Sequence, residues 1–154
     1  SGKDTEPFGR LRNLESLAIL SAPVENLRGL SALKRLRSLR LANLKHLSSL
    51  AGIEGLTNLE EIEMDTCRKV TSVDEVAHLT ALKKLHLNNG GAIASLKPLL
   101  NLDGLESVMF YESTNIVDGD LSPLLRQKNL ARISFQNRRH YSHQREFFGV
   151  AYSR

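Results

Sequence analysis

A spacing of leucines, Leu-x-x-Leu-x-Leu, recurs along this chain at a nearly constant interval. It is clearest in the segment LKKLHLNN, residues 82–89. Five further segments align with it: LESLAILS (14–21), LRSLRLAN (36–43), LEEIEMDT (59–66), LESVMFYE (105–112) and LARISFQN (130–137). Their central apolar residues are 22 to 25 positions apart: Leu17, Leu39, Ile62, Leu85, Val108 and Ile133. A fixed period over six copies predicts a repeat architecture, with one short strand in each unit.

A second apolar series lies between these segments, with an apolar residue at every third position. Its members are Val24, Leu27 and Leu30; Leu47, Leu50 and Ile53; Val70, Val73 and Val76; Ile93, Leu96 and Leu99. Because residues three apart share one face of a 3₁₀-helix, this spacing predicts a tight helical return leg after each strand. One unit cannot bury both of its apolar edges, so neighbouring units must stack into a continuous core.

The phrases SSLAGIEGLTNLEEIEM and ASLKPLLNLDGLESV, in which a return leg leads into a strand, resemble the short bacterial leucine-rich repeats of internalins. The resemblance covers about residues 11–137. It implies an α/β solenoid with six strands in a curved parallel sheet on the concave face and 3₁₀ or short helical return legs. The chain departs from the family at the turn position that usually holds Asn. The residues there are Ala22, Leu44, Cys67, Gly90 and Ser113.

We expect neighbouring backbone groups or buried water to satisfy the amides and carbonyls of these turns. Cys67 is expected to be a small buried residue rather than a reactive thiol. Gly90 and Gly91 are expected to permit the turn after the fourth strand. Ser72 and Glu75 fit a capping box. In the segment GDLSPLLRQ, Ser122 before Pro123 favours a true α-helix.

The 154 residues, 41% of them apolar, are expected to form one domain. We assign residues 11–137 to the solenoid, residues 1–10 to an N-terminal cap or a remnant of an expression tag, and residues 138–154 to a C-terminal cap. Caps are needed because the end repeats expose core edges. The last segment offers four aromatic residues to cover the final repeat: Tyr141, Phe147, Phe148 and Tyr152.

Composition narrows the class of partner. No apolar run approaches the roughly 18 residues needed to cross a bilayer, so we predict no membrane contact. The single cysteine, Cys67, excludes an internal disulfide and favours a reducing compartment, which we take to be the cytoplasm. The net charge of +4 is spread along the chain, and only NRRHYSHQR near the end is locally basic. Nucleic-acid binding through this tail is therefore a remote alternative.

Alternation along each strand places three columns of side chains on the open face. They are Ser16, Ser38, Glu61, Lys84, Ser107 and Arg132; Ala18, Arg40, Glu63, His86, Met109 and Ser134; and Leu20, Ala42, Asp65, Asn88, Tyr111 and Gln136. Glu61, Glu63 and Asp65 form an acidic rib between Arg40 and the pair Lys84 and His86, and neighbours roughly 5 Å apart can pair their charges.

Two interpretations of this surface stay open. The first is a solvated surface that pairs its own charges and adds little stability. The second is a partner site in which exposed Met109 and Tyr111 supply an apolar anchor. On the second interpretation the predicted partner-binding residues are Arg40, Glu61, Glu63, Asp65, Lys84, His86, Asn88, Met109, Tyr111, Arg132 and Gln136.

The residues that invite an enzymatic or metal assignment are few. His140 and His143 are three apart, but no neighbouring Cys or Asp completes a coordination set, and capping or core packing is the favoured interpretation. Glu63 and His86 suit an acid–base pair, yet the repeat is expected to place no serine or cysteine nucleophile near them. We predict no catalytic residue, cofactor, metal or small-molecule substrate.

These observations predict a non-enzymatic module that binds one protein partner through its concave sheet. The resemblance implies a narrower hypothesis, an immunity or inhibitor protein that neutralises a cognate toxin. A regulatory adaptor or a targeting domain of a larger protein is the alternative. The acidic rib argues against nucleic acid on the concave face, because it would repel phosphate.

Overall fold

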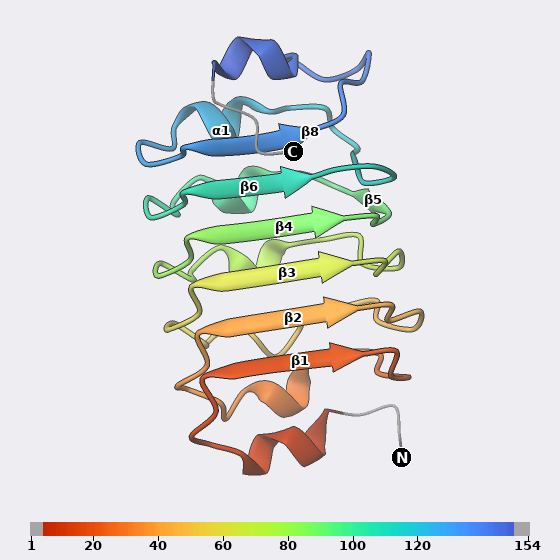
Figure 1. Cartoon of the computed structure of the whole chain (residues 1–154), viewed down its shortest axis with the longest axis vertical. Helices are drawn as coiled ribbons and strands as arrows, with labels where there is room; N and C mark the ends of the chain where they lie inside the picture. Colours follow the sequence, from red (N-terminus) through yellow and green to blue (C-terminus); the bar gives the residue numbers. More distant parts are fainter. Residues whose placement is uncertain (1–4, 150–154) are drawn as a thin grey trace.

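Six strands lie side by side in chain order and form one parallel sheet (Figure 1). They are β1 (Ser16–Leu20), β2 (Ser38–Ala42), β3 (Glu61–Asp65), β4 (Lys84–Asn88), β6 (Ser107–Phe110) and β8 (Arg132–Phe135). The computed structural model describes residues 5–149. In the register, the central residues of the six segments pair with one another from strand to strand. The predicted six-stranded parallel sheet is confirmed.

The return legs lie behind the sheet in Figure 1, and most of them contain a short helix. Three of these are 3₁₀-helices: η2 (Arg28–Leu30), η3 (Asp74–Val76) and η4 (Lys97–Leu99). The leg between β2 and β3, which carries Leu47, Leu50 and Ile53, has turns but no helix, and this corrects the prediction of a helix after each strand. Gly52 in this leg has φ of 121°, outside the helical region. The longest repeat has α1 (Ser122–Leu125), which is the sole α-helix within residues 5–149 and is the one that Ser122 and Pro123 predicted. Two-residue strands β5 (Ala92–Ile93) and β7 (Asn115–Ile116) form a small parallel sheet.

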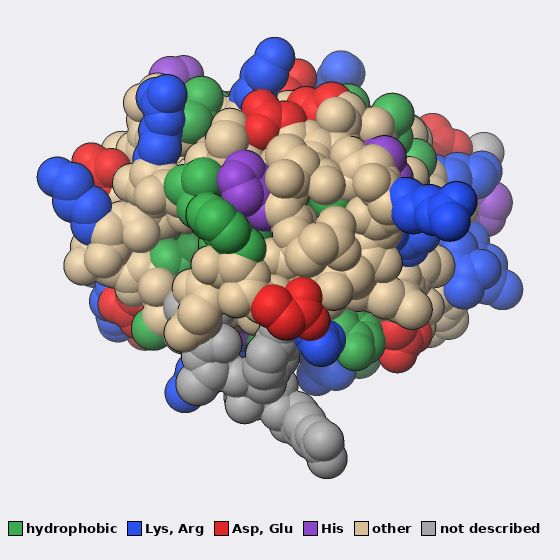
Figure 2. Space-filling model, turned by 90° about the horizontal axis from the view of Figure 1, so that it is seen from above, with side chains coloured by type: hydrophobic (Ala, Val, Ile, Leu, Met, Phe, Trp, Pro, Cys, Tyr) green, Lys and Arg blue, Asp and Glu red, His purple; other side chains and the backbone are tan. Residues whose placement is uncertain are grey.

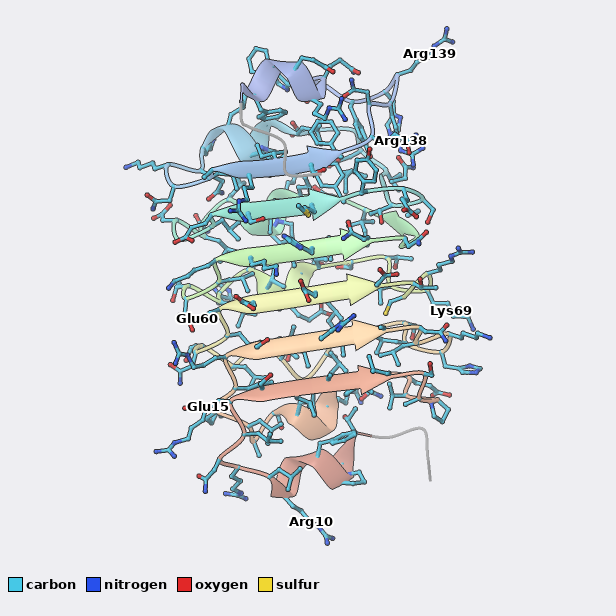
Figure 3. All side chains as sticks on the ribbon, in the orientation of Figure 1. Arg10, Glu15, Glu60, Lys69, Arg138 and Arg139 are labelled. Carbon is cyan, nitrogen blue, oxygen red and sulfur yellow. The ribbon has the colours of Figure 1, made fainter. Side chains whose placement is uncertain are left out.

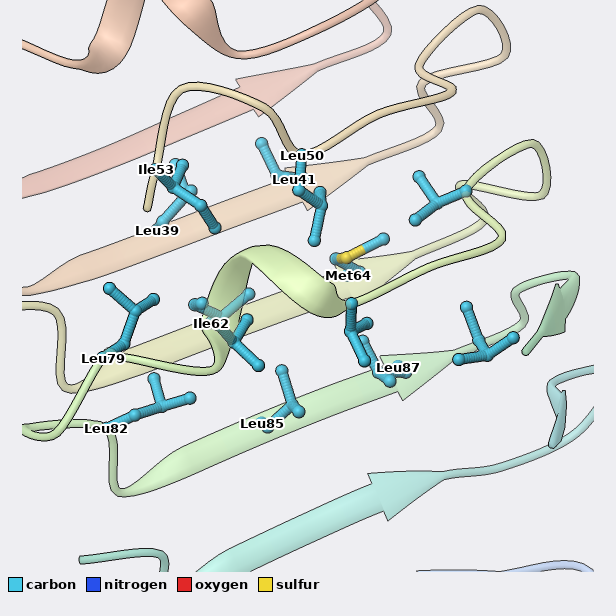
Figure 4. Packing of buried hydrophobic residues seen from close by; sticks show 14 of the residues in the cluster. Leu39, Leu41, Leu50, Ile53, Ile62, Met64, Leu79, Leu82, Leu85 and Leu87 are labelled. Carbon is cyan, nitrogen blue, oxygen red and sulfur yellow. The ribbon is translucent and has the colours of Figure 1, made fainter. Parts of the chain in front are cut away.

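One apolar core runs through all the repeats. The central strand residues Leu39, Ile62, Leu85, Val108 and Ile133 are at most 3% exposed, and the whole second apolar series is buried with them. Figure 4 shows how Leu50, Ile53 and Leu79 of the return legs and loops lie over the buried side chains of β2, β3 and β4. Stacking therefore buries both apolar edges of each unit, as the repeat required.

The turns that follow the strands share one backbone device. Ser21, Asn43, Thr66, Asn89 and Glu112 all have φ between 50° and 58°, in the left-handed region. In this conformation the amide of Asn43 donates to the carbonyl of Asp65 at 2.9 Å, and Thr66 donates to Asn88 at 3.2 Å. Neighbouring backbone thus satisfies the amides of these two residues, as expected. At Gly90 the expectation is wrong, because the amide donates to the side-chain hydroxyl of Thr114 at 2.8 Å. Cys67 is buried, and burial raises the pKa of its thiol.

Two local predictions need correction. Ser72 accepts a hydrogen bond from the amide of Asp74, two residues on, but the N-cap of η3 is Val73 and has no side-chain cap hydrogen bond. Oε2 of Glu75 has no hydrogen-bond partner, so the capping box does not form. The turn after β4 takes its left-handed residue from Asn89, not from the glycines. Gly91 is required for a different reason: a Cβ there would lie 2.2 Å from the carbonyl oxygen of Arg68 in the previous turn.

Both ends of the solenoid carry a further 3₁₀-helix. At the start, η1 (Glu6–Arg10) packs against η2. At the end, β8 leads to η5 (Arg145–Phe148) through a segment in which Tyr141 is buried. Phe110, Phe135, Tyr141 and Phe148 form a chain of ring contacts with centroids 4.8 to 6.1 Å apart. Phe147 is 62% exposed, contrary to expectation, and Tyr152 lies outside the described residues.

Candidate functional site

The open face of the sheet, opposite the return legs, carries the three predicted columns of side chains. The register pairs Arg40 with Glu63 and Glu63 with His86, and it pairs Asp65 with Asn88. Tyr111 and Gln136 lie one residue beyond the ends of β6 and β8, so the third column continues past the strands there. Tyr111 is still tied to the column, because its amide donates to Oδ1 of Asn88 at 3.2 Å.

The predicted residues differ in how far they reach into solvent. Arg40, Glu61, Asp65, Tyr111, Arg132 and Gln136 are exposed, and the other five are half-buried: Glu63, Lys84, His86, Asn88 and Met109. The half-buried residues lie toward the middle of the sheet, where neighbouring strands flank them on both sides. The face therefore has a half-buried, mostly polar centre with more exposed side chains around it.

One ion pair holds the centre of this face. Nζ of Lys84 lies 2.7 Å from Oε1 of Glu63, and this contact holds the pKa of the Glu63 carboxyl below its usual range. Glu61 and Asp65 form no ion pair within residues 5–149; Asp65 instead accepts a hydrogen bond from the Thr66 hydroxyl at 2.7 Å. Two carboxylates of the acidic rib are therefore left without a cation.

His86 does not pair by charge with the acidic rib, which corrects the sequence-based expectation. Burial, reinforced by the nearby charge of Lys84, lowers the pKa of His86 to about 4 and outweighs the opposite effect of Glu63. The imidazole is thus neutral near pH 7, and its Nδ1 stands 3.8 Å from Oε1 of Glu63, too far for a hydrogen bond. Arg40 likewise makes no ion pair with a described residue.

A serine does lie beside this histidine, contrary to the prediction. Nε2 of His86 is 2.9 Å from Oγ of Ser107, so Ser107, His86 and Glu63 follow one another across β6, β4 and β3. The predicted columns already placed Ser107 beside Lys84 on the neighbouring strand, two residues from His86, so the sequence could have indicated that a serine lies near the histidine. However, a histidine with a pKa near 4 is a weak base, and the amide of Ser107 is already donated to the Lys83 carbonyl at 3.0 Å.

Five of the predicted residues meet in one shallow hollow of about 150 Å³ on this face. Its lining consists of Arg40, Glu63, Asp65, His86 and Asn88, together with the buried residues Leu41 and Met64. Glu61, Lys84, Met109, Tyr111, Arg132 and Gln136 are outside this lining. The hollow is large enough for one side chain of a partner and too open to seclude a reaction from water.

Comparison with known proteins gives a structural likeness alone. No protein-family model matches the sequence, and no curated protein does. An internalin, InlF of Listeria monocytogenes, superposes with a TM-score of 0.63 at 22% identity, covering 90% of this chain and 47% of the internalin. A second internalin from the same bacterium gives a TM-score of 0.43 at 18% identity, over 82% of this chain and 75% of its own.

The fold is that of a leucine-rich repeat protein. The chain spans about half the length of InlF. The resemblance noted in the sequence is therefore confirmed at the level of the fold, and the open face described above is the sheet surface of a leucine-rich repeat solenoid.

Elsewhere in this leucine-rich repeat chain, the histidines near the end are engaged in the fold. Nε2 of His140 lies 2.9 Å from the carbonyl of Ile116, and Nδ1 of His143 lies 2.8 Å from the hydroxyl of Ser142. In the part of the chain that the structure describes, no three residues among His, Cys, Asp and Glu are grouped to hold a metal ion. Within the same part, no helix has the length and apolar character to cross a bilayer.

Proposed function

We propose that this leucine-rich repeat chain is a non-enzymatic recognition module that binds a protein partner through the open face of its sheet. The observation that carries the proposal is the juxtaposition at Asn88. This residue lines the polar hollow and accepts a hydrogen bond from the amide of Tyr111, a residue that is 39% exposed. The polar hollow, which can orient a partner, is thus adjacent to Tyr111, which can provide apolar contact area.

The carboxylates of Glu61 and Asp65 favour a partner with a positively charged surface. Both are exposed and without a cation, whereas Glu63 is already neutralised by Lys84. A partner that brings a Lys or Arg side chain to this rib gains an ion pair without breaking one. Since the sheet is rigid, the side chains facing the partner lose little freedom on binding.

A pair of variants tests the proposal. Immobilised wild-type chain and the variant Glu61→Lys with Asp65→Lys are each exposed to lysate of the native organism, and the captured proteins are identified by mass spectrometry. Asp74→Lys with Asp103→Lys is the matched control, because these exposed carboxylates lie off the open face and change the net charge equally. We expect the partner to be lost from the first variant and kept by the control.

Tyr111→Ala provides the quantitative measurement on the partner so identified. Truncation of a central aromatic anchor weakens binding by about 1–2 kcal/mol or more, which is roughly tenfold. Isothermal titration calorimetry measures the change, and circular dichroism checks that the exposed site leaves the fold intact. An unchanged affinity would show that the partner does not bind through the open face.

The two narrower hypotheses, a toxin inhibitor and a regulatory adaptor or targeting domain, differ in what the partner does. If co-expression of this chain rescues cells from a partner that is lethal when expressed alone, the inhibitor is established. A partner that is harmless alone favours the adaptor. The single partner and the cytoplasmic location remain predictions of the sequence.

A further inference from the structure

The two edges of the sheet differ in how their charges are balanced. Where the strands begin, Glu60 bonds Arg37 at 2.7 Å and Lys83 at 3.1 Å. Where they end, the turns after β2 and β3 carry a set of exposed basic side chains, which we call the basic ridge: Lys45, His46, Arg68 and Lys69. None of the four forms an ion pair within residues 5–149. Figure 3 shows Glu60 and Lys69 at opposite edges. Figure 2, seen from above, shows Lys and Arg side chains at both sides of the molecule.

The repeat holds the cations of the ridge close together. Strand β2 pairs with β3 at an offset of 23 residues, and the hydrogen bond from Asn43 to Asp65 carries this register into the turns. Lys45 and Arg68 are therefore at equivalent positions one strand apart, as are His46 and Lys69, and neighbouring strands are separated by about 5 Å. The charges of Lys45 and Arg68 repel one another at this spacing, and an anion on the ridge relieves the repulsion.

A hollow adjoins one end of the ridge. It has a volume of about 230 Å³ and is lined by Ser21, Ala22, Pro23, Asn43, Lys45 and His46. The side-chain amide of Asn43 donates to the hydroxyl of Ser21 at 3.0 Å and links the two turns that form its wall. An ammonium group, a serine hydroxyl and a histidine thus surround a space that fits one carboxylate side chain.

We propose that the basic ridge binds an extended acidic segment of another protein, with one carboxylate in the hollow and further carboxylates on Arg68 and Lys69. An extended peptide advances about 3.3 Å per residue, so side chains on one of its faces recur at about 7 Å. This interval is longer than the strand spacing of about 5 Å, and the long, flexible side chains of Lys45, Arg68 and Lys69 span the difference. The ridge lies outside the three columns of the open face, and the proposal is therefore independent of the proposed function.

The observations favour a peptide over a nucleic acid. No Phe, Tyr or Trp lines the hollow or belongs to the ridge, so bases would find no large ring to stack on. Asp65 is exposed at the end of β3, just before the turn that carries Arg68. A peptide can place an uncharged residue opposite this carboxylate, whereas a nucleic acid brings a phosphate with every nucleotide.

The test is a titration of the ¹⁵N-labelled chain, followed by two-dimensional NMR, with three probes: acetylated octaglutamate, octauridylate and phosphatidylserine vesicles. The ridge variant is Lys45→Glu, Arg68→Glu and Lys69→Glu. The matched control is Lys34→Glu, Arg126→Glu and Lys128→Glu, three exposed residues in the segments that precede β2 and β8, with the same change in net charge. Both variants are first checked for a wild-type-like amide spectrum.

We expect octaglutamate to shift the amides of the ridge and of Ser21 and Asn43, with affinity at least about tenfold weaker in the ridge variant and less than about threefold weaker in the control. Equal losses in both variants would mean that net charge alone attracts the peptide, and would overturn the proposal. Shifts elsewhere, or no shifts, would also overturn it. Tighter binding of octauridylate or of vesicles at the ridge would replace the acidic peptide with that ligand.

Discussion

At the scale of the residue, His86 shows how burial decides charge. It lies on the half-buried centre of the open face, with Lys84 beside it on β4, Glu63 on β3 and Arg132 nearby, and its pKa is lowered from 6.5 to about 4. The unfolded chain takes up this proton near pH 6.5, whereas the folded chain does so only near pH 4. Between these values the unfolded state binds more protons, so stability falls as the pH is lowered.

This linkage gives a measurable pH dependence. Between pH 7 and pH 4.5, the difference in His86 protonation between the folded and unfolded states should lower the free energy of unfolding by about 2–3 kcal/mol. In His86→Asn the free energy of unfolding should no longer show this part of the pH dependence. His78→Asn, at an exposed histidine, is the matched control and should keep it. Urea denaturation at several pH values measures the difference. Parallel curves for wild type and His86→Asn would contradict the burial effect.

The contact between His86 and Ser107 leads to a second prediction at this scale. Because His86 is a weak base and the Ser107 amide is engaged in the sheet, the serine should not be an activated nucleophile. We expect no adduct after incubation with a fluorophosphonate probe, as judged by intact mass. A single adduct that disappears in Ser107→Ala would show that the serine is reactive and would reopen an enzymatic function.

At the scale of the element, a buried threonine fixes the turn after β4. Thr114 is 1% exposed; its hydroxyl accepts from the amide of Gly90 at 2.8 Å and donates to the carbonyl of Leu87. In this repeat, a side chain from the next turn thus satisfies backbone groups at the position where leucine-rich repeats usually have Asn. This role could not be predicted from the repeat alignment, because Thr114 follows the aligned position rather than occupying it.

Thr114→Val tests the role of this hydroxyl. Valine keeps the shape of threonine but leaves the Gly90 amide and the Leu87 carbonyl without their partner, which costs about 1–3 kcal/mol. The same change at exposed Thr80 is the control and should be close to neutral. Thermal denaturation of both variants measures the difference, and equal melting temperatures would show that the hydroxyl does not support the turn.

Sequence periodicity predicted the elements well because each depends on local spacing. The strands, their register and the three 3₁₀ return legs follow from apolar residues at intervals of two and three, and the short α-helix follows from Ser122 and Pro123. The same spacing gave a wrong prediction for the leg between β2 and β3, which has no helix. The charge state of His86 could not be predicted in this way, because it depends on how deeply neighbouring strands bury the ring. The basic ridge was also missed: Lys45 and Arg68 are ordinary loop residues in the sequence, and only the turns bring them together.

At the scale of the whole molecule, the two ends of the solenoid are protected unequally. At the C-terminal end, Phe135 is fully buried within the chain of aromatic contacts, and the Tyr141 hydroxyl accepts from the amide of Ile116 at 3.1 Å. At the N-terminal end, Leu17 is half-buried, although its counterpart Leu39 is 1% exposed, and Leu20 is 55% exposed. Strand β1 pairs only with β2 among the described strands.

This asymmetry predicts the order in which the repeats open. The stability of a solenoid is approximately the sum of the stabilities of its repeats and of the interfaces between neighbouring repeats. An end repeat, which has a neighbour on one side only, therefore opens before an inner repeat with neighbours on both sides. We expect hydrogen–deuterium exchange, followed by mass spectrometry, to be fastest in the strand amides of β1, slower in β8 and slowest in β3 and β4. Phe135→Ala should raise exchange in β8 toward that of β1 while leaving β3 little changed. Uniform exchange across all six strands, in contrast, would mean that the solenoid opens as one cooperative unit and that its ends are equally protected.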